Sequence, residues 1–128
     1  MSLDYKVFVY GTLRTGDVRS GVLSDMQLLG QAKFIKETTT SSRYTLVDLG
    51  AFPGLIEGGY TSVLGEIWEI DHYTKQYLDL MEGVPLLYQD KPVEIDGEED
   101  IFAYFLVNPR GYPEIKSGDW FKKESRSN

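Results

Sequence analysis

Alternating apolar and polar positions predict several β-strands along this chain. The clearest alternation runs from Ser62 to Ile70, and a first β-rich run, Lys6 to Tyr10, ends at Gly11. Residues 43–49 alternate weakly, and a short strand at Leu55-Ile56 follows the Gly- and Pro-rich loop 50–54. Two further runs, 87–95 and 101–107, flank an Asp96-Gly97 turn signal and are predicted to pair as a hairpin.

The strongest helix signal covers residues 72–81. Asp71 is a suitable N-cap, Gly83 suits the C′ position, and Pro85 prevents the helix from continuing. The helix has one apolar face, because apolar residues repeat at helical period at Tyr73, Tyr77, Leu80 and Met81.

The segment between the first strand and residue 40 carries weaker signals. Asp17 to Ser24 is predicted to form one or two helical turns with Asp17 as the cap. Residues 27–40 are strand-like in parts, with Gly30 as a bulge. Many strands, one strong helix and the lack of alternating βα units predict an α+β fold, either an antiparallel sheet or a small barrel with a packed helix.

Length and composition indicate one ordinary globular domain. The chain has 128 residues, of which 41% are hydrophobic and 26% charged, so it is long enough to bury a core. We predict a single domain over residues 1–121. Residues 122–128, which include Lys122, Lys123 and Arg126, are predicted to form a flexible, solvated tail.

Charge and residue counts exclude several classes of function. A net charge of −7 disfavours binding to nucleic acid or to an anionic membrane, because phosphate contacts need clustered Lys and Arg. With no cysteine and a single histidine, His72, neither a disulfide nor a metal site is expected. The sequence shows no signal peptide and no membrane-length apolar run. We expect a cytoplasmic protein, by default a monomer, that acts on a small molecule.

The first candidate for chemistry is the segment Tyr10-Gly11-Thr12-Leu13-Arg14, directly after the first strand. Where the strand ends, backbone N–H groups lose their ladder partners, and Gly11 allows a ligand to approach the backbone closely. Successive free amides bind a carboxylate or stabilise an oxyanion. The segment therefore predicts either such a cradle or a plain exit from the strand, and Arg14 either attracts a carboxylate or faces solvent.

The second candidate is Glu82, at the end of the predicted helix. The helix dipole disfavours a negative charge there, and the residues around it (Met81, Val84, Pro85, Leu86 and Leu87) are apolar. If those residues enclose the carboxylate, its pKa rises toward the range that suits a general base. Glu82 is thus either a general base or an exposed glutamate near a helix cap.

Ordered short motifs from about residue 5 to 121 resemble the gamma-glutamylcyclotransferase family, which includes the avirulence-induced-gene-like proteins. The likeness is greatest to its gamma-glutamylamine cyclotransferase branch. The matching pieces are Tyr10-Gly11-Thr12-Leu13, Phe52-Pro53-Gly54-Leu55-Ile56, Gly65-Glu66-Ile67-Trp68-Glu69-Ile70, Leu78-Asp79-Leu80-Met81-Glu82-Gly83-Val84-Pro85, Leu87-Tyr88 and Ser117-Gly118-Asp119-Trp120.

The resemblance implies a small mixed, mainly antiparallel β-barrel with a packed helix, whose cavity binds a γ-glutamyl group. It implies that Glu82 is the general acid/base, and that the reaction releases 5-oxoproline and an amine with no metal and no cofactor. The substrate-binding residues that it implies are Tyr10, Gly11, Thr12, Leu13 and Tyr88.

Some features leave other interpretations open. Asp90 occupies a position at which many relatives carry a basic residue, and Tyr88 either lines the pocket or belongs to the core. Trp120 is predicted to be a packing anchor. A non-catalytic module that binds a small anion on the same fold is the alternative function, and a structural domain of a larger complex is a third.

Overall fold

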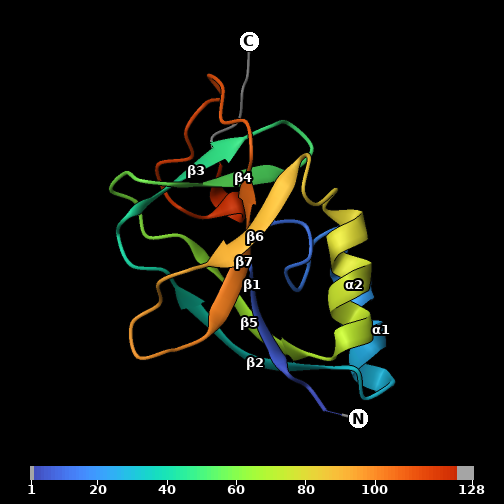
Figure 1. Cartoon of the computed structure of the whole chain (residues 1–128). Coiled ribbons are helices and arrows are strands. Elements are labelled where there is room, and N and C mark those ends of the chain that lie inside the picture. The colour runs from blue at the N-terminus through green and yellow to red at the C-terminus, as the bar shows by residue number, and fades with distance from the viewer. Residues whose placement is uncertain (1, 124–128) are drawn as a thin grey trace.

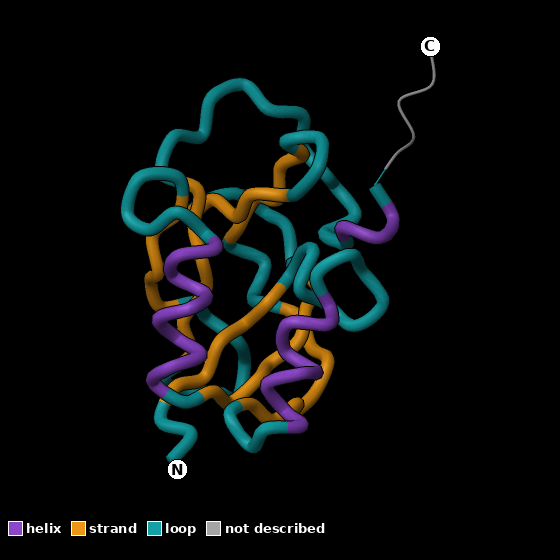
Figure 2. Tube along the Cα trace, turned by 90° about the vertical axis from the view of Figure 1, so that its right-hand side faces the viewer, coloured by secondary structure: helices purple, strands orange, loops and turns teal. Residues whose placement is uncertain are grey.

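The computed structural model describes residues 2–123. Within that range both α-helices lie on one side of a β-sheet (Figure 1), and Figure 2, which faces that side, shows them as separate columns in front of the strands. The elements are β1 (Tyr5–Val9), α1 (Ser20–Leu28), β2 (Ala32–Thr39), β3 (Tyr44–Asp48), β4 (Pro53–Glu57), β5 (Leu64–Ile70), α2 (His72–Met81), β6 (Tyr88–Pro92), β7 (Ile101–Leu106) and the 3₁₀ helix η1 (Trp120–Lys122).

The sheet is mixed and mainly antiparallel, which confirms the predicted α+β class. Its strand order over the described residues is β2-β5-β1-β7-β4-β3, with β6 on the other edge of β7. The β6–β7 hairpin pairs as predicted, and the parallel pairs are β1–β7 and β4–β7. Closure into a barrel is not observed, because no ladder joins β2 to β3 within residues 2–123. β2 is solvent-exposed along most of its length, as suits an edge strand.

A split beside β7 creates room at the end of β1. β1 pairs with β7 only at Lys6↔Ile101 and Val7↔Phe102, whereas β4 joins the same strand further along, at Leu55↔Phe105. β1 stops pairing with β7 after Val7. β4 pairs with the same edge of β7 about three residues further along that strand. Tyr10, just past the end of β1, lies at this split.

Alternation along β1 directs its side chains to two hydrophobic clusters on opposite faces of the sheet. Phe8 belongs to the cluster that also contains Leu46, Leu55 and Ile67. Val7 belongs to the second cluster, which contains Leu23 of α1 and Leu78 of α2. The helices therefore cover the second face.

The bounds and caps of α2 match the prediction, but the apolar face seen in the sequence is not the face that the helix buries. Asp71 accepts a hydrogen bond from the Thr74 amide at 2.8 Å, and Gly83 follows the helix with φ +62°. Tyr73, Tyr77 and Leu80 are exposed, and the buried positions are Thr74 and Leu78. The Thr74 hydroxyl donates to the Gln31 carbonyl, so a polar residue is satisfied on the buried face and the more hydrophobic stripe is left outside.

The first helix lies later in the chain than predicted. α1 begins at Ser20 after an Arg19 cap, and Asp17 does not cap it. Instead the Asp17 carboxylate accepts from the Trp120 indole Nε1 at 2.9 Å. Residues 27 and 28 belong to α1, and Gly30 (φ +77°) lies in the turn after it. The bulge in β2 is at residue 35, not at Gly30.

Trp120 is buried, as predicted for a packing anchor. Of the predicted tail 122–128, the structure describes Lys122, which ends η1, and Lys123, and residues 124–128 lie outside the described residues. Among residues 2–123, none of the helices has the length and apolar character needed to cross a membrane.

Candidate active site

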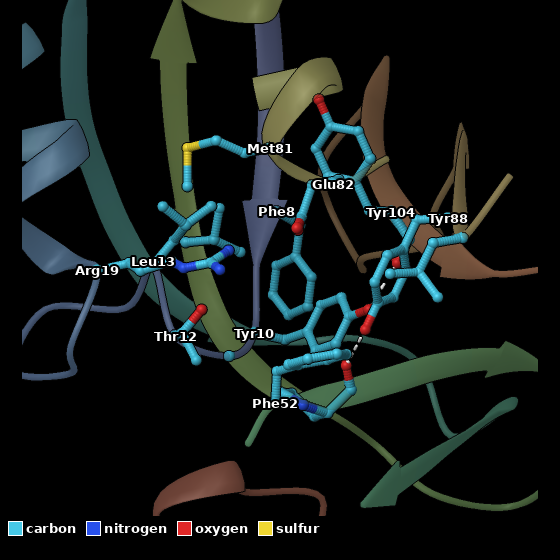
Figure 3. Close-up of a pocket in the computed structure, with 14 residues that line it drawn as sticks. Phe8, Tyr10, Thr12, Leu13, Arg19, Phe52, Met81, Glu82, Tyr88 and Tyr104 are labelled. Carbon is cyan, nitrogen blue, oxygen red and sulfur yellow. Dashed lines mark hydrogen bonds between the residues drawn. The ribbon is translucent and has the colours of Figure 1, made fainter. Parts of the chain in front are cut away.

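A pocket opens where the end of β1, the loop after it, the end of α2 and the start of β6 meet (Figure 3). It holds about 580 Å³ of empty space, with the solvent at its open mouth included. All of the predicted site residues line it. The full lining is Phe8, Val9, Tyr10, Gly11, Thr12, Leu13, Arg19, Phe52, Pro53, Met81, Glu82, Leu87, Tyr88 and Tyr104.

The loop 11–13 presents unpaired backbone amides to this pocket. Two of its three carbonyl groups accept hydrogen bonds: the Arg14 amide donates to the Gly11 carbonyl at 3.0 Å, and the Arg19 amide donates to the Thr12 carbonyl at 2.9 Å. Its own N–H groups donate no hydrogen bond to any described residue, although Gly11 and Leu13 are buried. Buried amides without a protein partner are rare. These amides are therefore available to an acceptor from outside the described residues.

Gly11 is required there because the loop packs tightly on β4. A Cβ at this position would lie 2.6 Å from Cγ and 2.7 Å from Cδ of Pro53. No side chain fits at that distance unless the backbone moves. The absence of a side chain thus lets the amide loop lie against the strand that lines the other side of the pocket.

Tyr10 fixes the split in the sheet. Its buried hydroxyl donates to the Tyr104 carbonyl of β7 at 2.6 Å and accepts from the Leu55 amide of β4 at 3.0 Å. Burial, with the nearby Tyr88 and Glu82, raises the pKa of Tyr10 well above its usual value. Tyr10 therefore stays neutral and joins two strands at the pocket wall.

Tyr88 is buried and still lines the pocket, so both interpretations of it hold. Its hydroxyl donates to the Pro53 carbonyl, and its ring lies 6.4 Å from that of Phe52. Burial raises its pKa, and the charge of Glu82 adds to the effect. Figure 3 shows Tyr88 with Tyr10 and Phe52 as one aromatic wall.

Glu82 caps the C-terminus of α2, and its amide donates to Leu78 at 2.9 Å. Its half-buried carboxylate points into the pocket (Figure 3) and forms no hydrogen bond within the described residues. Burial raises the pKa of this carboxyl from 4.5 to about 7, against a smaller lowering by Arg19. At neutral pH the group is populated in both protonation states.

The residues that enclose Glu82 differ from those predicted. Pro85 and Leu86 are exposed, and of the apolar sequence neighbours only Met81 and Leu87 line the pocket. The rest of the apolar enclosure comes from residues of other elements, mainly Phe8, Tyr10, Phe52, Tyr88 and Tyr104. The expected rise in pKa is present, but tertiary packing provides most of the burial that causes it.

Sequence reasoning missed Tyr104 and the charged cluster that holds it. The Tyr104 hydroxyl donates to Asp79 Oδ1 at 2.7 Å, and Lys75 Nζ lies 2.7 Å from Asp79 and 3.2 Å from Asp90. Asp90, the departure from the family pattern, therefore neutralises Lys75 and lies outside the pocket lining. Tyr104 is one of several aromatic residues in β7, and no sequence signal separated it from the core.

Sequence reasoning also missed Arg19 and placed Arg14 wrongly. Arg14 is buried outside the pocket, donates to Asp119 Oδ1 at 2.8 Å and lies over the Phe121 ring. The cation that lines the pocket is Arg19, which has no motif around it in the sequence. The single histidine, His72, contacts Tyr5 and lies outside the lining, and residues 2–123 contain no cluster of three potential metal ligands.

Comparison with known proteins gives the family of this chain. The family described as Gamma-glutamyl cyclotransferase, AIG2-like matches residues 7–122. The chain belongs to this family. A Vibrio cholerae serotype O1 protein provisionally named a gamma-glutamylcyclotransferase is 40% identical over 94% of this chain and 99% of its own.

Other gamma-glutamylcyclotransferase relatives extend the likeness. The gamma-glutamylaminecyclotransferase of Bos taurus is 34% identical over 84% of this chain and 67% of its own length. The crystal structure of an AIG2-like protein from Mus musculus superimposes with a TM-score of 0.73 at 27% identity, covering 90% of this chain and 88% of that one. Family and relatives support gamma-glutamylcyclotransferase activity for the chain.

Proposed function

We propose that the protein cleaves a γ-glutamyl amine or a related γ-glutamyl compound, and releases 5-oxoproline and a free amine. One observation carries this proposal: a carboxylate without a hydrogen bond and three unpaired amides line the same pocket. The names of the relatives support the substrate class.

In the proposed reaction Glu82 moves the protons. Its carboxylate takes a proton from the substrate's α-ammonium, and the freed amine attacks the substrate's own δ-carbonyl carbon. A C–N bond forms within the new ring, and Glu82 gives the first proton to the leaving nitrogen as the original amide C–N bond breaks. The ring nitrogen then passes its second proton, through the Glu82 carboxylate, to the released amine, which departs as an ammonium ion. A pKa of about 7 suits both directions of transfer.

We propose that the amides of residues 11–13 bind the negative charges of the substrate and of the intermediate. They donate hydrogen bonds to the α-carboxylate or to the oxyanion of the tetrahedral intermediate, and stabilisation of an oxyanion is worth roughly 3–4 kcal/mol per donor. Ring closure is intramolecular, so the aromatic wall of Tyr10, Phe52 and Tyr88 contributes by holding the substrate in its folded conformer. Neither a metal nor a cofactor takes part in this mechanism.

The test is release of 5-oxoproline from a panel of γ-glutamyl compounds by the wild type and by Glu82→Gln. We expect the variant to lose on the order of 10²-fold or more in kcat, the effect of removing a positioned acid/base. Glu57→Gln is the matched control, because Glu57 is exposed, pairs with Lys91 and lies outside the pocket. Its kcat should equal that of the wild type.

The same experiment separates the alternatives. Equal turnover by Glu82→Gln removes this residue from the mechanism. Binding of γ-glutamyl compounds without turnover by the wild type identifies a module that binds small anions, the function that the unpaired amides alone would support.

A further inference from the structure

Only two charged side chains line the pocket, and they differ in how far they are buried. Glu82 is half-buried, whereas Arg19 is exposed at the mouth. The Arg19 side chain forms neither a hydrogen bond nor an ion pair with residues 2–123. By contrast, Arg14 is paired with Asp119, and Lys75 with Asp79 and Asp90. Arg19 is thus a cation at the pocket whose partner is not supplied by the described part of the chain.

The backbone holds Arg19 beside the amide loop. Its N–H donates to the Thr12 carbonyl at 2.9 Å, and it caps the start of α1. Figure 3 shows its guanidinium on the Thr12–Leu13 side of the pocket, opposite Tyr88. The guanidinium lowers the pKa of both Glu82 and Tyr88, although burial outweighs it in each case. Its charge therefore affects both groups, although it forms no ion pair with the Glu82 carboxylate.

The chemistry of the site puts the leaving group near this charge. Its nitrogen must lie against Glu82 to receive a proton, and the inner wall behind the site is closed by Phe8 and Tyr10. The substituent on that nitrogen therefore extends toward the mouth, past Arg19. In an amino acid leaving group the carboxylate is only two bonds from the nitrogen, within reach of an Arg side chain.

We propose that Arg19 selects substrates whose leaving amine carries a carboxylate, so that γ-glutamyl amino acids are preferred over the matching γ-glutamyl amines. This inference rests on the proposed function and narrows it. A guanidinium binds a carboxylate by charge-assisted hydrogen bonds, and it repels an amine that carries a second positive charge. The aromatic wall and the amides of residues 11–13 contact the γ-glutamyl part in this proposal, so they would not distinguish the two substrate classes.

The test compares two substrates that differ in one group, γ-glutamylalanine and γ-glutamylethylamine. The ratio of their kcat/KM values should favour the acid in the wild type and fall about tenfold in Arg19→Gln, the loss expected for one charge-assisted hydrogen bond. Arg19→Lys should keep most of the ratio. Arg43→Gln is the control, since Arg43 is exposed, its side chain pairs with Glu94, and it lies outside the pocket.

Two outcomes overturn the inference while turnover is observed. An unchanged ratio in Arg19→Gln means that Arg19 does not meet the leaving group. An equal fall for both substrates means that it binds the γ-glutamyl part instead.

Equilibrium binding to Glu82→Gln separates this inference from the proposed function. Calorimetry should show tighter binding of the acid than of the amine, and adding Arg19→Gln should abolish the difference. If the wild type turns over neither compound but this difference persists, the proposed function fails and the selectivity of Arg19 stands. If neither compound binds, both proposals fail.

Discussion

Glu82 is a carboxylate whose surroundings oppose its charge. The aromatic wall removes water from it, and the single cation that faces it, Arg19, is exposed and only partly compensates. Burial therefore outweighs charge attraction, and the carboxyl holds its proton to about pH 7. The burial that suits Glu82 to acid/base chemistry also lowers the stability of the folded protein when this carboxyl ionises.

That cost predicts a pH-dependent difference between the wild type and Glu82→Gln. Below pH 4.5 the carboxyl is protonated in both the folded and the unfolded chain. Between 4.5 and about 7 the unfolded chain releases the proton first, so the wild type loses stability as pH rises. At pH 8 we expect the free energy of unfolding of Glu82→Gln to exceed that of the wild type by about 2 kcal/mol, a figure that allows for the partial exposure of the Glu82 carboxyl. Urea unfolding at pH 4.5 and 8 checks this, and an equal gap at both pH values contradicts it.

Gly11 provides a second prediction at this scale. Gly11→Ala should push the amide loop away from Pro53, because the new Cβ would lie 2.6 Å from a rigid ring. We expect a loss of about 1–3 kcal/mol in stability and a larger fractional loss in kcat/KM. Gly21→Ala in α1 is the matched control: nothing lies within 4 Å, and alanine should stabilise the helix by up to about 1 kcal/mol. Normal activity in Gly11→Ala would show that the loop position is unimportant.

At the level of elements, α2 carries the candidate acid/base at its last turn, so its placement sets the position of Glu82. Both ends of the helix are fixed locally, by Asp71 at the start and Gly83 after the end. The buried contacts of Thr74 and Leu78 then orient it on the sheet. The helix is thus held by its caps and its less hydrophobic face.

Asp71→Ala should remove the cap that begins α2. The Thr74 amide would lose its partner on a buried face, which costs about 1–2 kcal/mol. Asp25→Ala removes an equal charge from an exposed position of α1 and should stay within about 0.5 kcal/mol of the wild type. Chemical denaturation of both variants decides the point, and equal stabilities would mean that the cap contributes nothing.

At the scale of the whole molecule, one buried ion pair joins the two ends of the domain. Arg14 follows the amide loop, and Asp119 precedes η1, where it also accepts from the Phe121 amide. Thr15 continues this loop and donates to the buried Glu66 of β5. The loop at the pocket is therefore anchored from behind by residues that take no part in lining it.

Removing Asp119 should leave the buried Arg14 guanidinium with only a weaker ion pair, at 3.7 Å, to the exposed Glu37. We expect Asp119→Ala to destabilise the protein by about 3–5 kcal/mol, and Arg14→Met combined with it to recover part of that loss. The exposed pair Lys91–Glu57 serves for comparison, with a coupling energy below about 1 kcal/mol. Double-mutant cycles with urea unfolding measure the coupling energy of each pair. Similar values for the two pairs would contradict the larger contribution expected of Arg14 and Asp119.

Local signals in the sequence predicted much of this molecule correctly. The α2 bounds, its Asp71 cap, the β6–β7 hairpin and the strand that ends at the amide loop depend on neighbouring residues. Capping, turn chemistry and the alternation of strands act over a few residues, so they are visible in a single chain. The α1 region failed because Asp17 is bound by Trp120 from the far end of the chain, which no local pattern records.

The sequence by itself therefore determined the α+β class, the amide loop after the first strand and the candidate Glu82. Only the tertiary structure decided that these two segments line one pocket, that aromatic side chains of β1, β6 and β7 bury the carboxylate, and that Arg19 rather than Arg14 faces it. It also decided which face of α2 is buried and that the sheet stays open. The physical reason is that burial, and every pKa that depends on it, is set by contacts between residues far apart in the chain.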